Sequence, residues 1–118
     1  MEISFSSNSL ASSCNVWEKA VRKYGHQDAR LVALRLAQMR AAATLVDLMK
    51  LPGARCHQLT GDRKNQFAVD LRHPYRIIFT PTDNPAPLRE DGGIDLTKVR
   101  SVTILQVKED YHGGKRKK

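Results

Sequence analysis

The chain ends in a run of side chains that could perform acid/base chemistry. Asp110, Tyr111 and His112 follow an apolar stretch with the composition of a strand, residues 99–107. An imidazole exchanges protons near neutral pH, a carboxylate can orient it, and a phenol can donate a hydrogen bond to an oxyanion. The trio therefore indicates part of an active site, although polar residues after a last strand commonly form a solvated terminus.

Two strand residues could complete such a site. His57 shares one side of a short expected strand with Arg55 and Leu59, and Arg76 alternates with Ile77 on another. A guanidinium suits a phosphate because its planar fork donates two hydrogen bonds at once. Each residue taken singly has a plainer interpretation, because strand histidines commonly pack or face solvent and most strand arginines are solvated.

Helices that could support these residues follow from the hydrophobic spacing. A short alternation over residues 3–5 predicts a first strand, and the serine-rich segment after it offers helix-capping oxygens. Apolar residues at steps of three and four predict helices over residues 10–24 and 28–49. Gly25 is expected to end the first helix and Asp28 to cap the second.

The spacing then changes to a period of two. Strands are expected over residues 55–60, over a run at 67–71 that resumes at 75–80 after His73-Pro74, and over residues 99–107. The apolar residues of the last strand change parity between Ile104 and Leu105, which implies either a bulge or burial on both faces. We predict an α+β fold of order β-α-α-β-β-β, with a helical hairpin on one side of an antiparallel sheet.

A long segment before the last strand is expected to be an exposed loop. Residues 81–96 hold three prolines and two glycines. The sequence assigns this loop no role.

Length and charge limit the possible functions. A chain of 118 residues, 41% hydrophobic, can form one core but not two. Its net charge is +8, of which four charges lie in residues 115–118, so the remainder of the chain keeps +4. A basic surplus favours a polyanion such as nucleic acid, because binding releases condensed counterions, and it favours acidic protein partners too.

The cysteines and the N-terminus bear on the compartment. Cys14 and Cys56 form no close pair, so we expect reduced thiols rather than a zinc or redox motif. Glu2 stands where a signal peptide would carry bases, and no apolar run approaches the length of a membrane span. We expect a cytoplasmic protein that does not bind a membrane.

Three segments, taken in order, resemble the HigB branch of the RelE/ParE toxin superfamily. They are residues 51–63 (LPGARCHQLTGDR), 75–79 (YRIIF) and 110–112 (DYH). Members of this branch, also called plasmid maintenance killer proteins, are the growth-inhibiting halves of bacterial toxin-antitoxin pairs. The resemblance covers residues 1–112 as one toxin domain and leaves residues 113–118 as a basic tail.

The resemblance implies a ribosome-dependent endoribonuclease that cuts translated mRNA without a metal ion or other cofactor. The catalytic residues it implies are His57, Arg76, Asp110, Tyr111 and His112. The partners it implies are the ribosome, mRNA and a HigA-like helix-turn-helix antitoxin, with operator DNA bound only through the antitoxin complex. Candidate RNA contacts are Arg55, Arg63, Lys64, Lys115 and Arg116.

Two alternatives stay open at this stage. ParE relatives on the same scaffold inhibit gyrase, so a gyrase-directed or otherwise non-catalytic binding protein is a competing hypothesis. A metal site formed by His57, Asp110 and His112 has suitable ligand types but no supporting spacing. The sequence also does not decide which histidine would be the acid and which the base.

Overall fold

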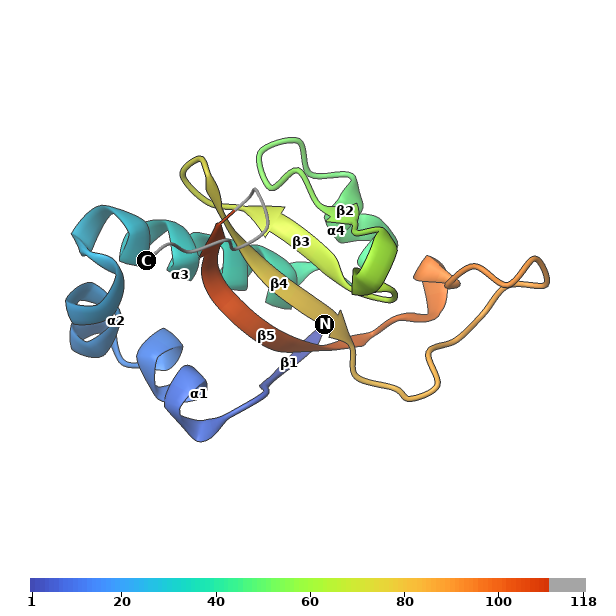
Figure 1. Ribbon diagram of the computed structural model, residues 1–118, viewed down its shortest axis with the longest axis horizontal. Coiled ribbons are helices and arrows are strands. Elements are labelled where there is room, and N and C mark those ends of the chain that lie inside the picture. The colour runs from blue at the N-terminus through green and yellow to red at the C-terminus, as the bar shows by residue number, and fades with distance from the viewer. Residues whose placement is uncertain (111–118) are drawn as a thin grey trace.

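The computed structural model describes residues 1–110, with side chains through residue 108. It has the α+β class predicted from the sequence: one strand, then a run of helices, then the remaining strands. Figure 1 shows the longest helix passing behind the sheet, with the first two helices beside it. No helix in the described part of the chain is long and apolar enough to cross a membrane.

The sheet is mixed rather than purely antiparallel. Its strands lie in the order β1-β5-β4-β3-β2, and β1 pairs with β5 in parallel while the other neighbours are antiparallel. The parallel pair joins strands from the two ends of the described chain, which the helical crossover permits. The strand bounds are Glu2–Phe5 for β1, His57–Gln58 for β2, Phe67–Asp70 for β3, Tyr75–Pro81 for β4 and Ser101–Asp110 for β5.

The predicted order of three strands after the helices is wrong in detail. The run interrupted at His73-Pro74 is two strands, because a turn there brings β3 and β4 together as a hairpin. In this turn the Tyr75 amide donates to the Arg72 carbonyl at 2.8 Å. The expected strand over residues 55–60 shortens to the two residues of β2.

Each of the two predicted helices is divided. The first becomes α1 (Asn8–Asn15) and α2 (Trp17–Tyr24), and the second becomes α3 (His26–Ala41) and α4 (Leu45–Met49). The break before α2 lies at Val16, whose backbone is extended. The break before α4 is marked by Thr44, whose capping box with Asp47 starts a new helix. A serine cap is confirmed at Ser7, whose hydroxyl accepts from the Leu10 amide at 3.0 Å.

Asp28 is not the cap of the second helix, which is the role predicted from sequence. It lies within the first turn of α3, is 1% exposed and accepts two hydrogen bonds from Arg72 at 2.9 and 3.0 Å. Lys108 of β5 lies 3.1 Å from the same carboxylate. The hydrogen bonds from Arg72, followed by the effect of Lys108, hold the pKa of Asp28 below its ordinary value. Gly25 instead joins α2 to α3 with a φ of 86°, a conformation that glycine adopts without strain.

Asp28→Asn is expected to destabilise the protein by about 2 kcal/mol, because it breaks an ion pair whose carboxylate is buried. The loss is not larger because the Arg72 side chain that loses its partner is 53% exposed and can be hydrated. Since the folded pKa is lowered, the carboxylate's contribution is fully present above the unfolded pKa and is lost as pH falls through the folded value. Denaturant unfolding of parent and variant between pH 7 and pH 3 measures both effects. The stability difference should shrink at acid pH. Exposed Asp91, substituted in the same way, is the control, and a loss as large there would contradict the assignment.

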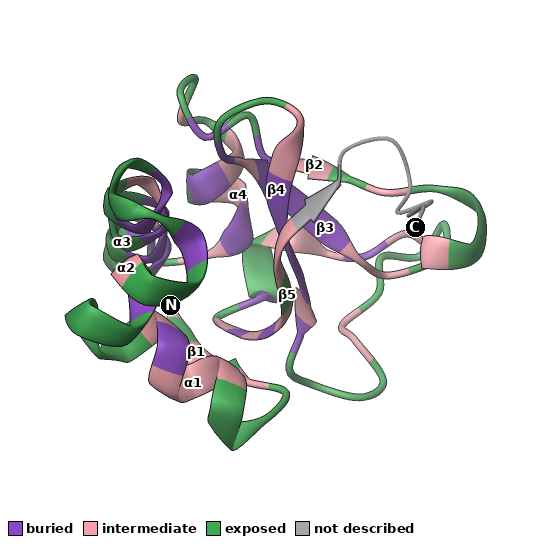
Figure 2. Ribbon diagram, turned by 60° about the vertical axis from the view of Figure 1, so that its left-hand side comes forward, coloured by how far each residue is buried: buried purple, intermediate pink, exposed green. Residues whose placement is uncertain are grey.

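The core lies between α3 and the helix-facing side of the sheet. Phe67 and Val69 of β3 and Ile77 and Phe79 of β4 belong to one buried cluster with the helix residues. Figure 2 shows this burial along β3 and β4. The helix side of the cluster includes Val32, Leu36 and Met39 from α3 and Leu45 and Leu48 from α4.

Two irregular segments complete the fold. The parity change in the last strand is a bulge at Leu105, because Ile78 lies opposite Gln106 while Phe79 lies opposite Ile104. The loop over residues 81–96 is only partly exposed, as Ile94 is buried with 4% of its surface accessible. One buried apolar side chain therefore anchors a segment that the sequence predicts to be an exposed loop.

Candidate functional site

The strand register gathers polar residues on the sheet face opposite the core. His57 lies opposite Ala68, and Asp70 lies opposite Arg76. Ala68 and Asp70 alternate with the core residues of β3, so their side chains point away from the helices. His57, Asp70 and Arg76 therefore share one face, contributed by three adjacent strands.

His57 is held by a backbone contact. Its Nδ1 lies 2.9 Å from the carbonyl oxygen of Arg55. A carbonyl can only accept, so Nδ1 carries the proton, and in the neutral ring the lone pair belongs to Nε2. The ring is half-buried, with a fixed tautomer suited to accepting a proton at Nε2.

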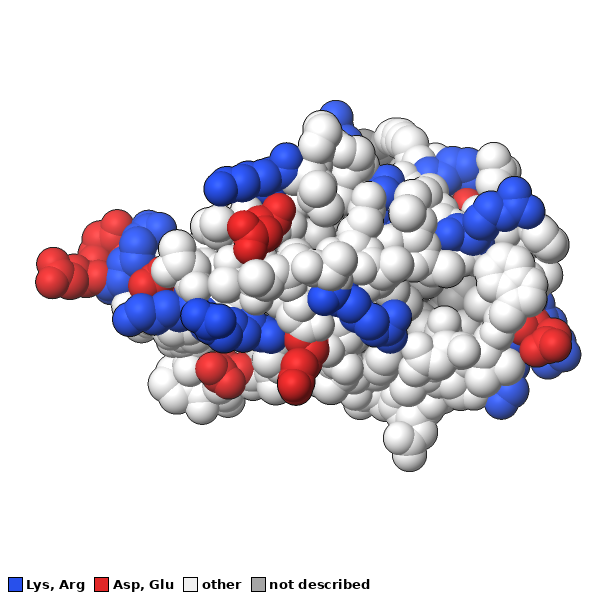
Figure 3. All heavy atoms as spheres, turned by 180° about the vertical axis from the view of Figure 1, so that it is seen from behind, with Lys and Arg blue, Asp and Glu red and all other residues white. Residues whose placement is uncertain are grey.

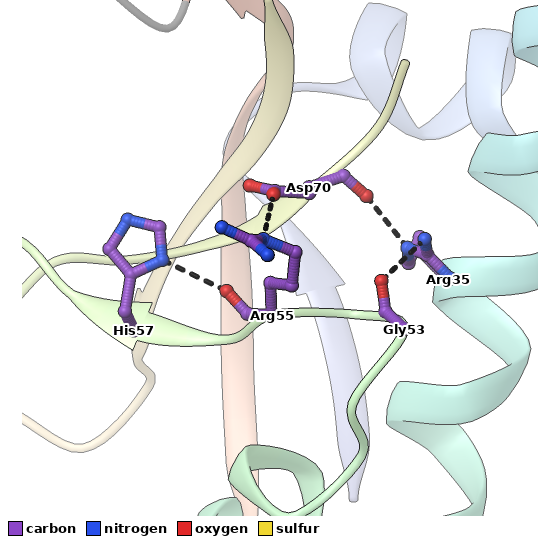
Figure 4. A network of polar contacts seen from close by, with 5 residues as sticks. All are labelled: Arg35, Gly53, Arg55, His57 and Asp70. Atoms are coloured by element: carbon purple, nitrogen blue, oxygen red, sulfur yellow. Dashed lines mark hydrogen bonds and ion pairs between the residues drawn. The ribbon is translucent and has the colours of Figure 1, made fainter. Parts of the chain in front are cut away.

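Arg55 reaches the same face although it lies outside β2. Its φ of 49° is left-handed, and its Nε lies 2.9 Å from Oδ2 of Asp70. The Arg55 side chain is 70% exposed and that of Asp70 is 19% exposed. The predicted RNA contact at Arg55 is thus an accessible guanidinium whose direction is set by a carboxylate, as Figure 4 shows.

A buried arginine from α3 fixes the backbone beneath this pair. Arg35 is 8% exposed and donates from Nε to the Asp70 carbonyl at 2.7 Å and from Nη2 to the Gly53 carbonyl at 2.9 Å. Burial lowers the pKa of Arg35, while the charge of Asp70 opposes the shift. Figure 4 shows Arg35 joining the segment before β2 to β3 from the helix side. These two hydrogen bonds from Arg35 hold the segments that carry Arg55 and Asp70 in place.

Arg76 differs from Arg55 in its burial. It is 8% exposed, in the middle of the sheet on β4. Its register partners are Asp70 on one side and Glu109 on the other. A phosphate that reached this guanidinium would be shielded from water, which strengthens the attraction.

A pocket of about 350 Å³ lies beside this face, at the turn between β3 and β4. Arg55 and Asp70 form part of its wall, and His73 and Tyr75 bring an imidazole and a phenol to it. The Tyr75 ring also has the Lys108 ammonium 4.7 Å from its centroid. The pocket has the size of a small-ligand site and contains donors, an acceptor and an aromatic ring.

The predicted terminal cluster falls mostly outside the described residues. Tyr111 and His112 lie beyond them, and for Asp110 only the backbone is described. That backbone pairs with Tyr75, whereas Glu109 lies opposite Arg76. The structure therefore brings together His57 and Arg76 of the predicted catalytic set and does not test the other three residues.

Two of the other predicted RNA contacts, Arg63 and Lys64, are neighbours in the turn between β2 and β3. Arg63 is half-buried and donates to Gln66 at 3.2 Å, and Lys64 beside it is exposed. Lys115 and Arg116 lie beyond the described residues. Figure 3 shows the opposite, helix-covered side of the molecule, where basic side chains are spread out with acidic ones between them.

Sequence reasoning missed Asp70, His73 and Tyr75. Asp70 has the alternation of a solvated strand residue, and His73 precedes a proline that marks a break. Only the register and the turn bring them beside Arg55. Among the side chains described, no three His, Cys, Asp or Glu residues are grouped as metal ligands would be.

Comparison with known proteins adds no relative. The chain matches no protein-family model, no curated protein and no solved structure. Evidence for function therefore comes from the fold and from the face that carries His57, Asp70 and Arg76.

Proposed function

We propose that this chain is a HigB-like toxin of the RelE/ParE superfamily, a ribosome-dependent endoribonuclease that cleaves translated mRNA. The observation that carries the proposal is the shared sheet face of His57 and Arg76. An imidazole with a fixed tautomer and a shielded guanidinium on one face are the groups that cleavage by a 2′-hydroxyl requires. The α+β fold, with helices covering the other face, is consistent with this family.

The proposed reaction needs proton transfer and charge stabilisation. The lone pair on Nε2 of His57 takes the proton of the 2′-hydroxyl, whose oxygen attacks the adjacent phosphorus. The bond to the 5′-oxygen breaks, and that oxygen leaves with a proton from an acid. The products are a 2′,3′-cyclic phosphate and a 5′-hydroxyl, and Arg76 stabilises charge on the phosphoryl oxygens. The acid is assigned to the segment 110–112.

The spacing within the sheet suits a single phosphate. His57 and Arg76 are two strands and two residues apart, so their Cα atoms are roughly 12 Å apart by ideal sheet geometry. An imidazole and an extended guanidinium can converge on one phosphoryl group across that span. Arg55 is accessible and directed by Asp70, which lets it bind a neighbouring phosphate.

Dependence on the ribosome follows from the shallow site. At the candidate site the described residues offer a sheet face and a pocket of about 350 Å³ rather than a channel that would align a strand of RNA. Correct alignment of reacting groups supplies a large part of a catalytic rate enhancement. We infer that the decoding site provides this alignment. A HigA-like antitoxin, itself bound to operator DNA, would keep the toxin inactive.

Purified protein is expected to cleave mRNA on programmed ribosomes and to leave the same RNA intact when ribosomes are omitted. The reaction is run after treatment with excess chelator, with enough magnesium restored to keep ribosomes assembled, because the proposed chemistry uses only side chains. Equal, codon-independent cutting of free RNA would refute ribosome dependence. Cleavage that returns only when a transition metal is added would favour metal-assisted hydrolysis. Intact mRNA together with inhibited DNA supercoiling would favour the gyrase-directed alternative.

A further inference from the structure

A second polar cleft lies away from the sheet, between α1 and α2. Its volume is about 450 Å³. Each of the described side chains that line it can donate a hydrogen bond, and none of these is a carboxylate. The lining residues are Ser9, Ser12 and Ser13 of α1 and Lys19, Arg22 and Lys23 of α2.

The two helices present matching stripes to this cleft. On each helix the lining residues stand at positions i, i+3 and i+4, which places them on one helical face. One stripe consists of hydroxyls and the other of cations. Arg22 and Lys23 are also favoured there by the carbonyl end of α2, but that preference does not reach Lys19, which lies in the first turn.

Lys19 is already directed into the cleft. Its Nζ donates to the Ser12 hydroxyl oxygen at 2.9 Å. The remaining protons of the ammonium and the proton of the Ser12 hydroxyl can still be donated to a ligand. Ser13 has a scaffolding role instead, because it is buried and bonded to the Leu10 carbonyl and, at 3.0 Å, to the Tyr24 hydroxyl.

We propose that the α1–α2 cleft binds a phosphoryl group of the RNA backbone, as a second anchoring point apart from the catalytic face. The three cations and two hydroxyl donors among the described lining residues match the oxygens of a phosphate. The phosphate could belong to RNA or to a free phosphate compound, and the surface beside the cleft favours RNA. A neighbouring pocket of about 270 Å³ shares Ser9 and Lys23 and reaches Gln106.

This neighbouring pocket extends the cleft toward the catalytic face. Gln106 of β5 is exposed and lies opposite Ile78, which in turn lies opposite Ala68, the partner of His57. The cleft therefore lies beside the β5 end of a register row whose other end, across β4 and β3, is His57. The choice of RNA rests on the proposed function, whereas the anion site itself rests on the cleft residues.

The test uses a short 2′-O-methyl oligoribonucleotide, which binds but cannot be cleaved by 2′-hydroxyl attack. Its affinity is measured against salt for the full chain and for the triple variant Lys19→Gln, Arg22→Gln, Lys23→Gln. The slope of log affinity against log salt should fall by about 0.7, since single strands give about 0.7 per phosphate neutralised and the cleft holds one. The matched control is Lys50→Gln, Lys98→Gln, Arg100→Gln, which removes the same charge from exposed positions elsewhere and should lower the slope much less.

The second measurement is a titration of the protein with inorganic phosphate, followed by NMR. We expect phosphate to shift the amide NMR signals of Ser9 and Ser12 until the shifts saturate. The same shifts should be absent in the cleft variant. Phosphate shifts combined with equal slopes in cleft and control variants would assign the site to a free phosphate compound and overturn the RNA source. No phosphate shifts, combined with equal slopes, would overturn the site altogether. Because the oligonucleotide cannot be cleaved, these outcomes are independent of whether the chain is a nuclease.

Discussion

His57→Gln is expected to slow mRNA cleavage on programmed ribosomes by about 10²–10⁴-fold, the usual contribution of a general acid or base. The reason is that Nε2 of His57 bears the lone pair that would accept the 2′-hydroxyl proton, while Nδ1 is committed to the Arg55 carbonyl. Glutamine keeps polarity and much of the volume but cannot exchange a proton near neutral pH. Single-turnover cleavage at saturating protein measures the chemical step.

The control for this prediction is His26→Gln. His26 is the exposed first residue of α3, on the helical layer, and it contacts Trp17 and Arg30. Its substitution should leave the cleavage rate unchanged. A folded His57→Gln variant that cleaves at the parent rate would remove His57 from the mechanism.

The second large effect is expected at Arg76. Arg76→Met keeps the length and apolar stem of this buried side chain but removes the guanidinium, so cleavage should fall by about 10²–10³-fold. Ribosome binding should change little, because a group that acts mainly on the transition state contributes more to the rate than to ground-state affinity. Cleavage and ribosome co-sedimentation are measured on the same preparations.

Two further variants sharpen this result. Arg76→Lys restores the charge without the planar fork and should recover part of the lost rate. Arg100→Met makes the same chemical change at an exposed position and should cleave like the parent. Equal losses in binding and cleavage for Arg76→Met would instead indicate that Arg76 only holds the substrate.

Hydrophobic periodicity predicted the buried face of α3 with Val32, Leu36 and Met39, but it also placed Trp17 and Leu34 in the core, where the structure leaves them exposed, and it did not predict where the helices break. The apolar steps of three and four continue past Val16 and past residues 42–44 and so mark neither break, although Val16 and Trp17 are 39% and 45% exposed. The interruptions depend on backbone geometry: an extended Val16 with neither glycine nor proline to mark it, and a new capping box at Thr44.

Pairing between distant strands could not be predicted from local patterns. The bulge at Leu105 left a change of parity in the sequence, so it was predictable as one of two possibilities. The parallel partnership of β1 with β5 leaves no such trace, because alternation is the same in parallel and antiparallel strands at a sheet edge. The sheet was therefore expected to be antiparallel throughout.

The site shows the same division between local and non-local information. His57 and Arg76 were identified by residue type and local motif, and the structure brings them to one face. Asp70 becomes part of the site only through its register with Arg76 and its ion pair with Arg55. The same holds for the serines and cations of the α1–α2 cleft, whose meeting depends on the break at Val16.

The chemistry of the cut ends decides whether this chain cleaves mRNA by attack of the 2′-hydroxyl. The parent protein is incubated with programmed ribosomes, the mRNA is recovered, and the cleavage position and both new termini are determined. We expect a cut within the decoding site, a 5′-hydroxyl on the downstream fragment and a 2′,3′-cyclic phosphate or its hydrolysis product on the upstream fragment. A 5′-phosphate with a 3′-hydroxyl, or mRNA that stays intact on the ribosome, would contradict it.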